Sequence, residues 1–391
     1  MGLVGATGTD TSSARTPEAT AQCGRFHVNR EDAPAAPWPT LGSVRRVAER
    51  VLTLRELNRA TLARQLLLGR KRLSARVVIE RLVGVQAQWP PAPYVGIWTR
   101  TTGFRRQALE RELGHGAVVK ATAMRGTLHL VTPRDYGLIR SAMSETHFPW
   151  ESSVAKRLEP SVRALAASGP VSSAEALAFV EREHGLTGIE GRRAWSAARV
   201  RAHLVHHHET ALWRGQPEAR FVALDEPEAH DPTEARAELL RRYLAAFGPA
   251  SRPDMVAWSR MHVPEIQRAL DRLEPLRRFR DQQGRELFDV ARAPLPDPET
   301  TAPARFLPKW DNVLLAFADR TRVLPETYRK SVIGSNGDVA QTFLVDGSVA
   351  GMWRVEKGRV LVEPFAPLAR STRRDVEEEA VRLEAFLTEC A

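Results

Sequence analysis

The chain has 391 residues, of which 43% are hydrophobic and 27% are charged. This length exceeds one small core and the composition is that of a globular protein, so we predict two to four folded domains. No run of about 18 apolar residues is present, and the chain begins without the features of a secretory signal, which favours the cytoplasm. Cys23 and Cys390 have no metal-ligand spacing around them, which argues against a disulfide framework or a zinc site.

The charge is unevenly distributed. Lys and Arg number 57 against 47 Asp and Glu, for a net charge of +10, and residues 45–150 hold 19 basic against 7 acidic residues, or +12 (19 − 7). This excess predicts a polyanionic partner that faces residues 45–150. Arginine enrichment in a GC-rich genome is the alternative, since only 6 of the 57 are lysines, but it does not explain the concentration in one segment.

Residues 1–43 are rich in Ala, Thr, Ser, Pro and Gly and predict a disordered leader. Residues 44–150 follow as a unit of helices and a β-hairpin. Apolar spacing and turn residues predict helices over 57–69, 74–85 and 105–113 and strands over 117–122 and 127–132. Three helices followed by a hairpin are typical of a winged helix.

The pattern returns twice, with little sequence identity. Residues 151–230 predict a second winged-helix unit, with helices over 171–183 and 192–207 and strands over 211–214 and 220–224. Residues 231–292 predict a third, with helices over 233–247, 252–260 and 263–273 and strands near Phe279 and Leu287. Residues 304–391 read as a β-rich domain, with strands over 342–345, 349–355 and 359–363, an Asp346-Gly347 turn and a closing helix over 371–389. The predicted fold class is mainly α with β-hairpin wings (α+β), built from tandem winged-helix units.

Gln86 and Gln88 flank one small residue where the predicted second helix ends, beside Trp89-Pro90-Pro91. Their amides could face a cleft. Alternatively, one glutamine caps the helix and the other is solvated.

Arg125, Thr127 and His129 lie on the predicted wing of the first unit. Arg125 could contact a phosphate, and His129 would face the same side as Thr127. His129 could equally be a structural histidine. The run His206-His207-His208 has no acidic or cysteine partner at suitable spacing, so we expect no metal.

Trp310, Asp311 and Asn312 place polar groups at a strand or loop edge, where they could support a substrate. Asp319 and Arg320 could do the same, although pairing with each other is favoured. Phosphate-binding loops and acyl-transfer motifs are absent from the sequence.

Several segments together resemble one family. These are Leu57-Asn58-Arg59-Ala60, Leu82-Val83-Gly84-Val85-Gln86-Ala87-Gln88, Pro93-Tyr94-Val95-Gly96, Met124-Arg125-Gly126-Thr127-Leu128-His129-Leu130-Val131, Gly248-Pro249-Ala250, Trp310-Asp311-Asn312, Asp319-Arg320-Thr321-Arg322-Val323 and Leu344-Val345-Asp346-Gly347. Together they resemble the AlkZ-like winged-helix DNA glycosylases, which include azinomycin-resistance enzymes of actinobacteria. Phe317 departs from the pattern, where a polar residue or histidine is more usual.

The resemblance implies a C-shaped body around DNA and a catalytic Gln-x-Gln motif, here Gln86 and Gln88. We expect DNA contacts from Arg59, Lys120, Arg125, Thr127 and His129, and support from Trp89, Trp310, Asp311 and Asn312.

The implied activity is monofunctional hydrolysis of N7-alkylguanine from double-stranded DNA, including bulky adducts or interstrand crosslinks of a genotoxic natural product. We expect no metal, cofactor or membrane, and a monomer in the cytoplasm near the nucleoid. A lyase would need an amine such as Lys120 or Lys309. A transcription regulator without catalysis and a protein-binding module are the alternatives.

Overall fold

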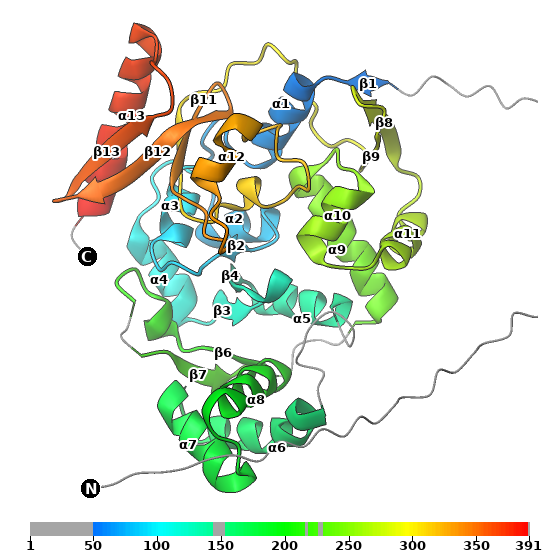
Figure 1. Cartoon of the computed structure of the whole chain (residues 1–391), viewed down its shortest axis with the longest axis vertical. Coiled ribbons are helices and arrows are strands. Elements are labelled where there is room, and N and C mark those ends of the chain that lie inside the picture. Colours follow the sequence, from blue (N-terminus) through cyan, green and yellow to red (C-terminus); the bar gives the residue numbers. More distant parts are fainter. Residues whose placement is uncertain (1–49, 144–152, 216–217, 226–229, 390–391) are drawn as a thin grey trace, which may run out of the picture. The chain divides into compact units, whose positions relative to one another are not determined.

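The computed structural model describes residues 50–143, 153–215, 218–225 and 230–389 (Figure 1). The leader predicted over 1–43 lies outside these residues. Within them the chain is a mixed α and β protein with a six-stranded, a four-stranded and a three-stranded sheet. No described helix is both long and apolar enough to cross a bilayer.

One order of elements, helix, strand, two helices and two strands, occurs twice in the first half of the chain. The first repeat consists of α2 (Ala75–Arg81), β2 (Val85–Gln86), α3 (Ala92–Trp98), α4 (Arg106–Gly114), β3 (Val119–Thr122) and β4 (Leu128–Val131). The second repeat consists of α6 (Ser153–Ala167), β5 (Val171–Ser172), α7 (Ser173–His184), α8 (Gly188–Arg201), β6 (Leu204–His206) and β7 (Arg220–Ala223). In each repeat the first strand pairs antiparallel with the last.

The two repeats share one sheet. β3 pairs with β6 through Lys120 and His206, which joins the strands in the order β2-β4-β3-β6-β7-β5. From either edge the strands come in the order first, last and middle strand of a repeat. The two repeats therefore meet through their middle strands, β3 and β6. In Figure 1, β6 and β7 lie beside α6, α7 and α8.

A third repeat follows with the same order. It consists of α9 (Pro232–Phe247), α10 (Arg252–Ser259), α11 (Val263–Arg272), β8 (Arg277–Asp281) and β9 (Glu286–Asp289). A single antiparallel bridge between Ala250 and Phe288 takes the place of the first strand. β1 (Val51–Leu52) adds to this sheet in parallel, beside β8.

The remaining elements surround the repeats. They are α1 (Leu54–Arg64), η1 (Met124–Gly126), α5 (Pro133–Ala142), η3 (His208–Ala211), β10 (Arg305–Leu307), η4 (Asn312–Leu314), α12 (Glu326–Val332), β11 (Thr342–Val345), β12 (Ser348–Glu356), β13 (Arg359–Pro364) and α13 (Arg370–Thr388). Strands β10 to β13 form an antiparallel sheet in sequence order. Side chains of the first repeat share a hydrophobic core with this sheet and α13.

Short polar side chains start the helices of all three repeats. The hydroxyls of Ser74, Ser172 and Ser251 accept hydrogen bonds from the third residue of α2, α7 and α10, as N-cap residues do. In α7 and α10 an acidic side chain at that position returns a bond to the serine backbone. Local sequence therefore determines where these helices begin.

Most predicted elements are confirmed, including every helix and strand of the third repeat and the hairpin at Asp346-Gly347. Three helices end earlier than predicted: α1 stops at Arg64, α2 at Arg81 and α8 at Arg201. After α2 and α8, strand pairing takes the residues that follow. The strand predicted over 211–214 is wrong, because η3 and a turn occupy this segment. Helices α3, α5, α6 and α12 were not predicted.

The prediction that residues 45–150 face phosphate as a whole is wrong for several of their arginines. Several pair with carboxylates from the last third of the chain instead. The pairs are Arg55 with Glu299 and Asp346, Arg59 with Asp346, Arg64 with Asp289, Arg70 with Glu379, and Arg100 with Asp311. Part of the basic excess therefore holds the two ends of the fold together.

The Asp346-Gly347 turn gives a test of this packing. Gly347 has φ +81° and a Cβ there would lie 2.4 Å from Leu62, whereas Gly358, with φ +80°, has nothing within 4 Å. Gly358→Ala should cost about 1–2 kcal/mol through backbone strain, and Gly347→Ala should cost roughly a further 1–3 kcal/mol through overpacking. Urea unfolding of both variants measures the difference, and equal losses would contradict the packing described.

Candidate active site

The two motif glutamines occupy different environments. Gln86 is the last residue of β2, is paired in register with His129 and is 5% exposed. The Ala87 amide donates to the Leu128 carbonyl (2.8 Å), which continues the pairing by one residue. Gln88 is exposed, and its Oε1 accepts a 3.4 Å hydrogen bond from the Leu128 amide. The motif therefore runs from the interior to the surface along the edge of the sheet.

A tight turn places Gln86 on this strand. Val83 and Gly84 have φ of 57° and 91°, which end α2 and reverse the chain into β2. A Cβ on Gly84 would lie 3.0 Å from Val131 and 3.4 Å from the Leu130 carbonyl, so glycine permits the close approach of β2 to β4. Gln86 thus belongs to a strand and not to the helix end where it was predicted.

A small pocket brings Gln86 together with the three polar residues predicted near position 310. Its lining includes Gln86, Arg100, Trp310, Asp311 and Asn312. Residues 308–312 come from the segment after β10, more than 200 residues away in sequence. The structure therefore places Trp310, Asp311 and Asn312 beside Gln86.

Each of these residues has a distinct contact. Asp311 and Arg100 form a bidentate ion pair, with two N to O distances of 2.8 and 2.9 Å, and both side chains are buried. Asn312 Nδ2 donates to the Gly84 carbonyl (2.7 Å). Trp310 has φ 54° and donates from Nε1 to the Gly337 carbonyl (3.1 Å). Asp311 and Asn312 thus fasten the 308–312 segment to the turn before Gln86.

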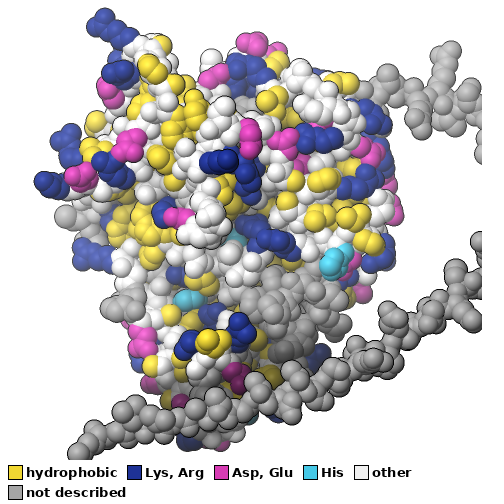
Figure 2. Space-filling view, viewed as in Figure 1, with side chains coloured by type: hydrophobic (Ala, Val, Ile, Leu, Met, Phe, Trp, Pro, Cys, Tyr) yellow, Lys and Arg dark blue, Asp and Glu magenta, His cyan; other side chains and the backbone are white. Residues whose placement is uncertain are grey.

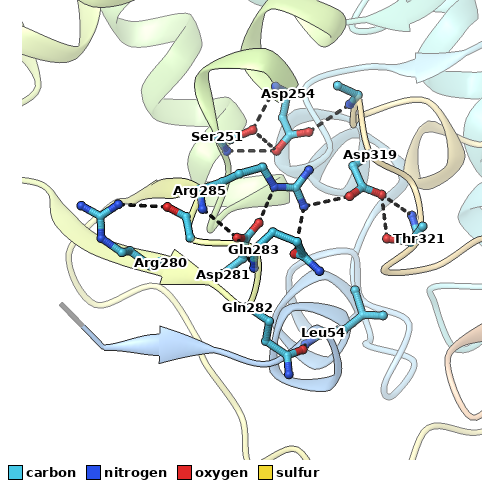
Figure 3. A network of polar contacts seen from close by, with 12 residues as sticks. Leu54, Ser251, Asp254, Arg280, Asp281, Gln282, Gln283, Arg285, Asp319 and Thr321 are labelled. Atoms are coloured by element: carbon cyan, nitrogen blue, oxygen red, sulfur yellow. Dashed lines mark hydrogen bonds and ion pairs between the residues drawn. The ribbon is translucent and has the colours of Figure 1, made fainter.

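Residues 318–321, which follow this segment, are held by the polar network in Figure 3. Arg285 donates to Asp281 (2.5 Å) and to Asp319 (2.8 Å), and Asp319 also accepts from Thr321. The Ala318 amide donates to Asp254 (2.9 Å). Asp319 therefore pairs with Arg285 of the third repeat, and its predicted pairing with Arg320 is wrong.

His129 was expected to contact DNA, but its side chain is completely buried. Its Nδ1 lies 3.0 Å from the Thr127 carbonyl, and burial together with the nearby positive charge of Arg125 lowers its pKa to about 3. The ring is therefore neutral at pH 7. Because Nδ1 donates to the carbonyl, Nε2 is an acceptor.

Arg125 lies at the tip of the β3–β4 hairpin, in η1, with φ 57°. The residue as a whole is half-buried; Nη1 donates to the Trp258 carbonyl (3.1 Å), and Nη2 is buried without a hydrogen-bond partner among the described residues. Burial and the charges of Arg260 and Arg320 lower its pKa to about 10. The Thr127 hydroxyl donates locally to the Met124 carbonyl (3.2 Å).

Basic side chains gather at the middle of the face in Figure 2, between the segments labelled α12 and α5 in Figure 1.

Two further residues expected at DNA lie inside the protein. Arg59 is 1% exposed and binds Asp346, Asn58 and the Thr300 carbonyl through its three guanidinium nitrogens. Lys120 is 6% exposed and belongs to the row of Leu130 and His206. Since side chains alternate along a strand, this row faces away from His129 and Gln86. Neither residue is placed to meet a phosphate.

Trp89 is half-buried next to Gln88. Arg100 and Gly84, which sequence reasoning did not select, are as important to the geometry as the predicted residues. Gly84 could have been selected from the sequence, because a glycine at a helix end commonly marks a turn. Arg100 carried none, because its partner lies 211 positions away.

The comparisons with known proteins identify the class. A family model for AlkZ-like DNA glycosylases matches residues 79–386, so the chain belongs to the AlkZ-like DNA glycosylase family. It is therefore an enzyme of the DNA glycosylase class, and DNA is its substrate.

Two comparisons name particular relatives. The interstrand DNA cross-link repair glycosylase of Streptomyces sahachiroi is 26% identical over 353 residues, which cover 82% of this chain and 92% of the relative. The solved structure of Streptomyces sahachiroi DNA glycosylase AlkZ matches with a TM-score of 0.72 and 22% identity, over 86% of this chain and 97% of that one. The family resemblance seen in the sequence is confirmed.

The buried histidines predict acid sensitivity of the fold. Burial, aided by Lys120 and Arg199, lowers the pKa of His206 to about 3. Because this value lies below that of the unfolded chain, the unfolded state binds more protons between about pH 3 and 6.5, and stability rises with pH through this window. In this window His206→Phe should lower the slope of the unfolding free energy against pH by roughly 1.4 kcal/mol per pH unit. Urea unfolding at several pH values measures the slope.

The exposed His208 provides the matched control, since His208→Phe should leave the slope of the wild type unchanged. An unchanged slope in His206→Phe would contradict the neutral, buried state of that ring.

Proposed function

We propose that this glycosylase hydrolyses the N-glycosidic bond of N7-alkylguanine in double-stranded DNA, including bulky adducts and interstrand crosslinks, with Gln86 and Gln88 as the catalytic residues. The observation that carries the proposal is the placement of Gln86, a buried neutral amide that lines a small pocket, beside exposed Gln88. The printed name of the 26% identical relative, a cross-link repair glycosylase, supports the crosslink substrate.

The chemistry suits neutral side chains. Alkylation at N7 gives guanine a positive charge, so the base leaves as a neutral molecule and needs little protonation. Water attacks C1′ while the C1′–N9 bond breaks, the electron pair leaves with the base, and one proton is released to solvent. Amide dipoles can orient the water and stabilise the positive charge on the sugar without titrating.

The repeats support a DNA-binding body. Helix, strand, two helices and a hairpin, with the first strand paired to the last, is the order of a winged helix. We infer three tandem winged-helix units within residues 44–150, 151–230 and 231–292, followed by the β-rich domain over 304–391. The half-buried Arg125, with Arg260 and Arg320 nearby, is the basic group we assign to the DNA backbone. We further propose that the protein acts as a monomer.

The first test is release of N7-methylguanine from methylated duplex DNA under single-turnover conditions. Gln86→Ala with Gln88→Ala should lower the release rate about 100-fold or more, while DNA affinity changes little, because neither amide carries charge. Release by liquid chromatography and affinity by fluorescence anisotropy are the two measurements.

Gln282→Ala, a glutamine on the β8–β9 turn of the third repeat, is the control and should keep full activity. Unchanged release by the double variant would refute the assigned residues. If the wild type released only a bulky adduct, the proposed substrate class would be restricted to bulky adducts.

A second test concerns the nucleophile. Lys120 lies on the opposite face of the sheet from Gln86, and Lys309 is paired with Asp338 (2.9 Å). Neither amine is therefore placed and free to attack C1′. Borohydride treatment during turnover should trap no covalent adduct between protein and DNA, with a bifunctional glycosylase as the positive control. A trapped adduct would contradict hydrolysis by water.

A further inference from the structure

Three buried acceptor atoms around Gly84 have no hydrogen-bond partner among the described residues. They are Gln86 Oε1, His129 Nε2 and Asn312 Oδ1. The three side chains are 5%, 0% and 6% exposed. An unsatisfied buried polar atom costs about 1–3 kcal/mol, so three together on one site indicate a missing donor.

The three side chains all lie close to Gly84. Gln86 and His129 are register partners on adjacent strands, which puts their side chains on the same face of the sheet within about 5 Å at Cβ. A Cβ built on Gly84 would lie 3.7 Å from Cδ2 of His129, the ring atom bonded to Nε2. Asn312 donates to the carbonyl of the same Gly84, and Asn312 and Gln86 line the same pocket.

The orientation of two of these acceptors is set by their other contacts. Nδ1 of His129 donates to the Thr127 carbonyl, which leaves Nε2 of the neutral ring unprotonated. The Gly84 carbonyl occupies Nδ2 of Asn312, which leaves its Oδ1 to face elsewhere. Neither atom can supply the donor that the other lacks.

We propose that Gln86 Oε1 and His129 Nε2 accept the two hydrogens of one water molecule, which is the nucleophile of the glycosylase reaction, that His129 is a positioning residue for this water, and that Asn312 is a positioning residue because it holds the Gly84 turn beside it. The inference rests on the proposed function and extends it to two residues outside the Gln-x-Gln motif. Water is the donor that fits, since it is neutral and small and its two hydrogens match the two acceptors of the register partners Gln86 and His129.

The site explains how the water attacks without a base. With both hydrogens directed at neutral acceptors, a lone pair of the oxygen faces the open side of the pocket, where C1′ would approach. The oxygen bonds to C1′, the C1′–N9 pair leaves with the base, and the released proton passes to solvent. His129 holds the water and does not take its proton, since an imidazolium would be buried beside the charge of Arg125.

The test compares two buried histidines on opposite faces of one sheet. His129→Phe removes the acceptor at similar volume and should lower the single-turnover rate on N7-methylguanine DNA about 100-fold with unchanged DNA affinity. His129→Gln restores an acceptor and should recover most of the rate. His206→Phe, at a buried position on the other face, should keep the wild-type rate.

A wild-type rate in His129→Phe would overturn the proposal. Failure of His129→Gln to recover the rate would also overturn it. An equal loss of rate in His206→Phe would do the same, since either result indicates a structural role for the buried ring.

A crystal structure of the unmodified full chain tests the water directly. Ordered water should lie within hydrogen-bond distance of Gln86 Oε1 and His129 Nε2, and its absence, with ordered water visible elsewhere, would overturn the site. Nitrogen NMR shifts should show His129 neutral and protonated at Nδ1 from pH 5 to 8. If the wild type released no alkylated base, the proposed function would fail while these two measurements still decided the water site.

Discussion

The structure depends on ion pairs between arginines of the first described segment and carboxylates in the last third of the chain. Arg64 with Asp289 and Arg100 with Asp311 are both fully or almost fully buried, and their partners lie 225 and 211 positions away. Removing one member of such a pair leaves an uncompensated buried charge, at a cost of about 3–5 kcal/mol. Arg64 thereby holds α1 against the third repeat, and Arg100 holds the 308–312 segment against the first repeat, so the pocket at Gln86 forms only when these distant segments pack together.

The sharing of one sheet by the first two repeats has a consequence for the chemistry. The β3–β6 pairing commits one face of the central strands to Lys120 and His206 and the other face to His129 and Gln86. The amine of Lys120 is thereby kept on the opposite face from Gln86. The charged residues that line the pocket beside Gln86 are paired, Arg100 with Asp311 and Lys309 with Asp338, which suits the cationic base that we propose as the substrate.

Strained backbone occurs at the turn before β2, at the tip of the β3–β4 hairpin and in the lining of the pocket. Val83, Arg125 and Trp310 all have left-handed φ values without being glycine, and Val83 is β-branched. Such conformations cost of order 1–3 kcal/mol each and persist only where the surroundings enforce them. Here the enforcing contacts are the pairing of β2 with β4, the bond from Arg125 to Trp258 and the bond from Trp310 to Gly337.

The sequence by itself determined the local structure and the motif. Serine caps, turn glycines and apolar spacing predicted most helices and hairpins, because these signals act over a few residues. The glutamine pair and its neighbouring segments were sufficient for the family. The ends of α2 and α8 were predicted too late, because strand pairing with distant residues competes with helix propensity at those positions.

Tertiary structure alone decided which of these residues form the site. Whether Arg59 and Lys120 face DNA or the interior depends on partners in other strands and in the last third of the chain, and composition cannot distinguish the two. The same holds for His129, whose register with Gln86 turns an expected DNA contact into a buried neutral acceptor. Burial and pairing arise from contacts between distant segments, and these exist only once the chain has folded.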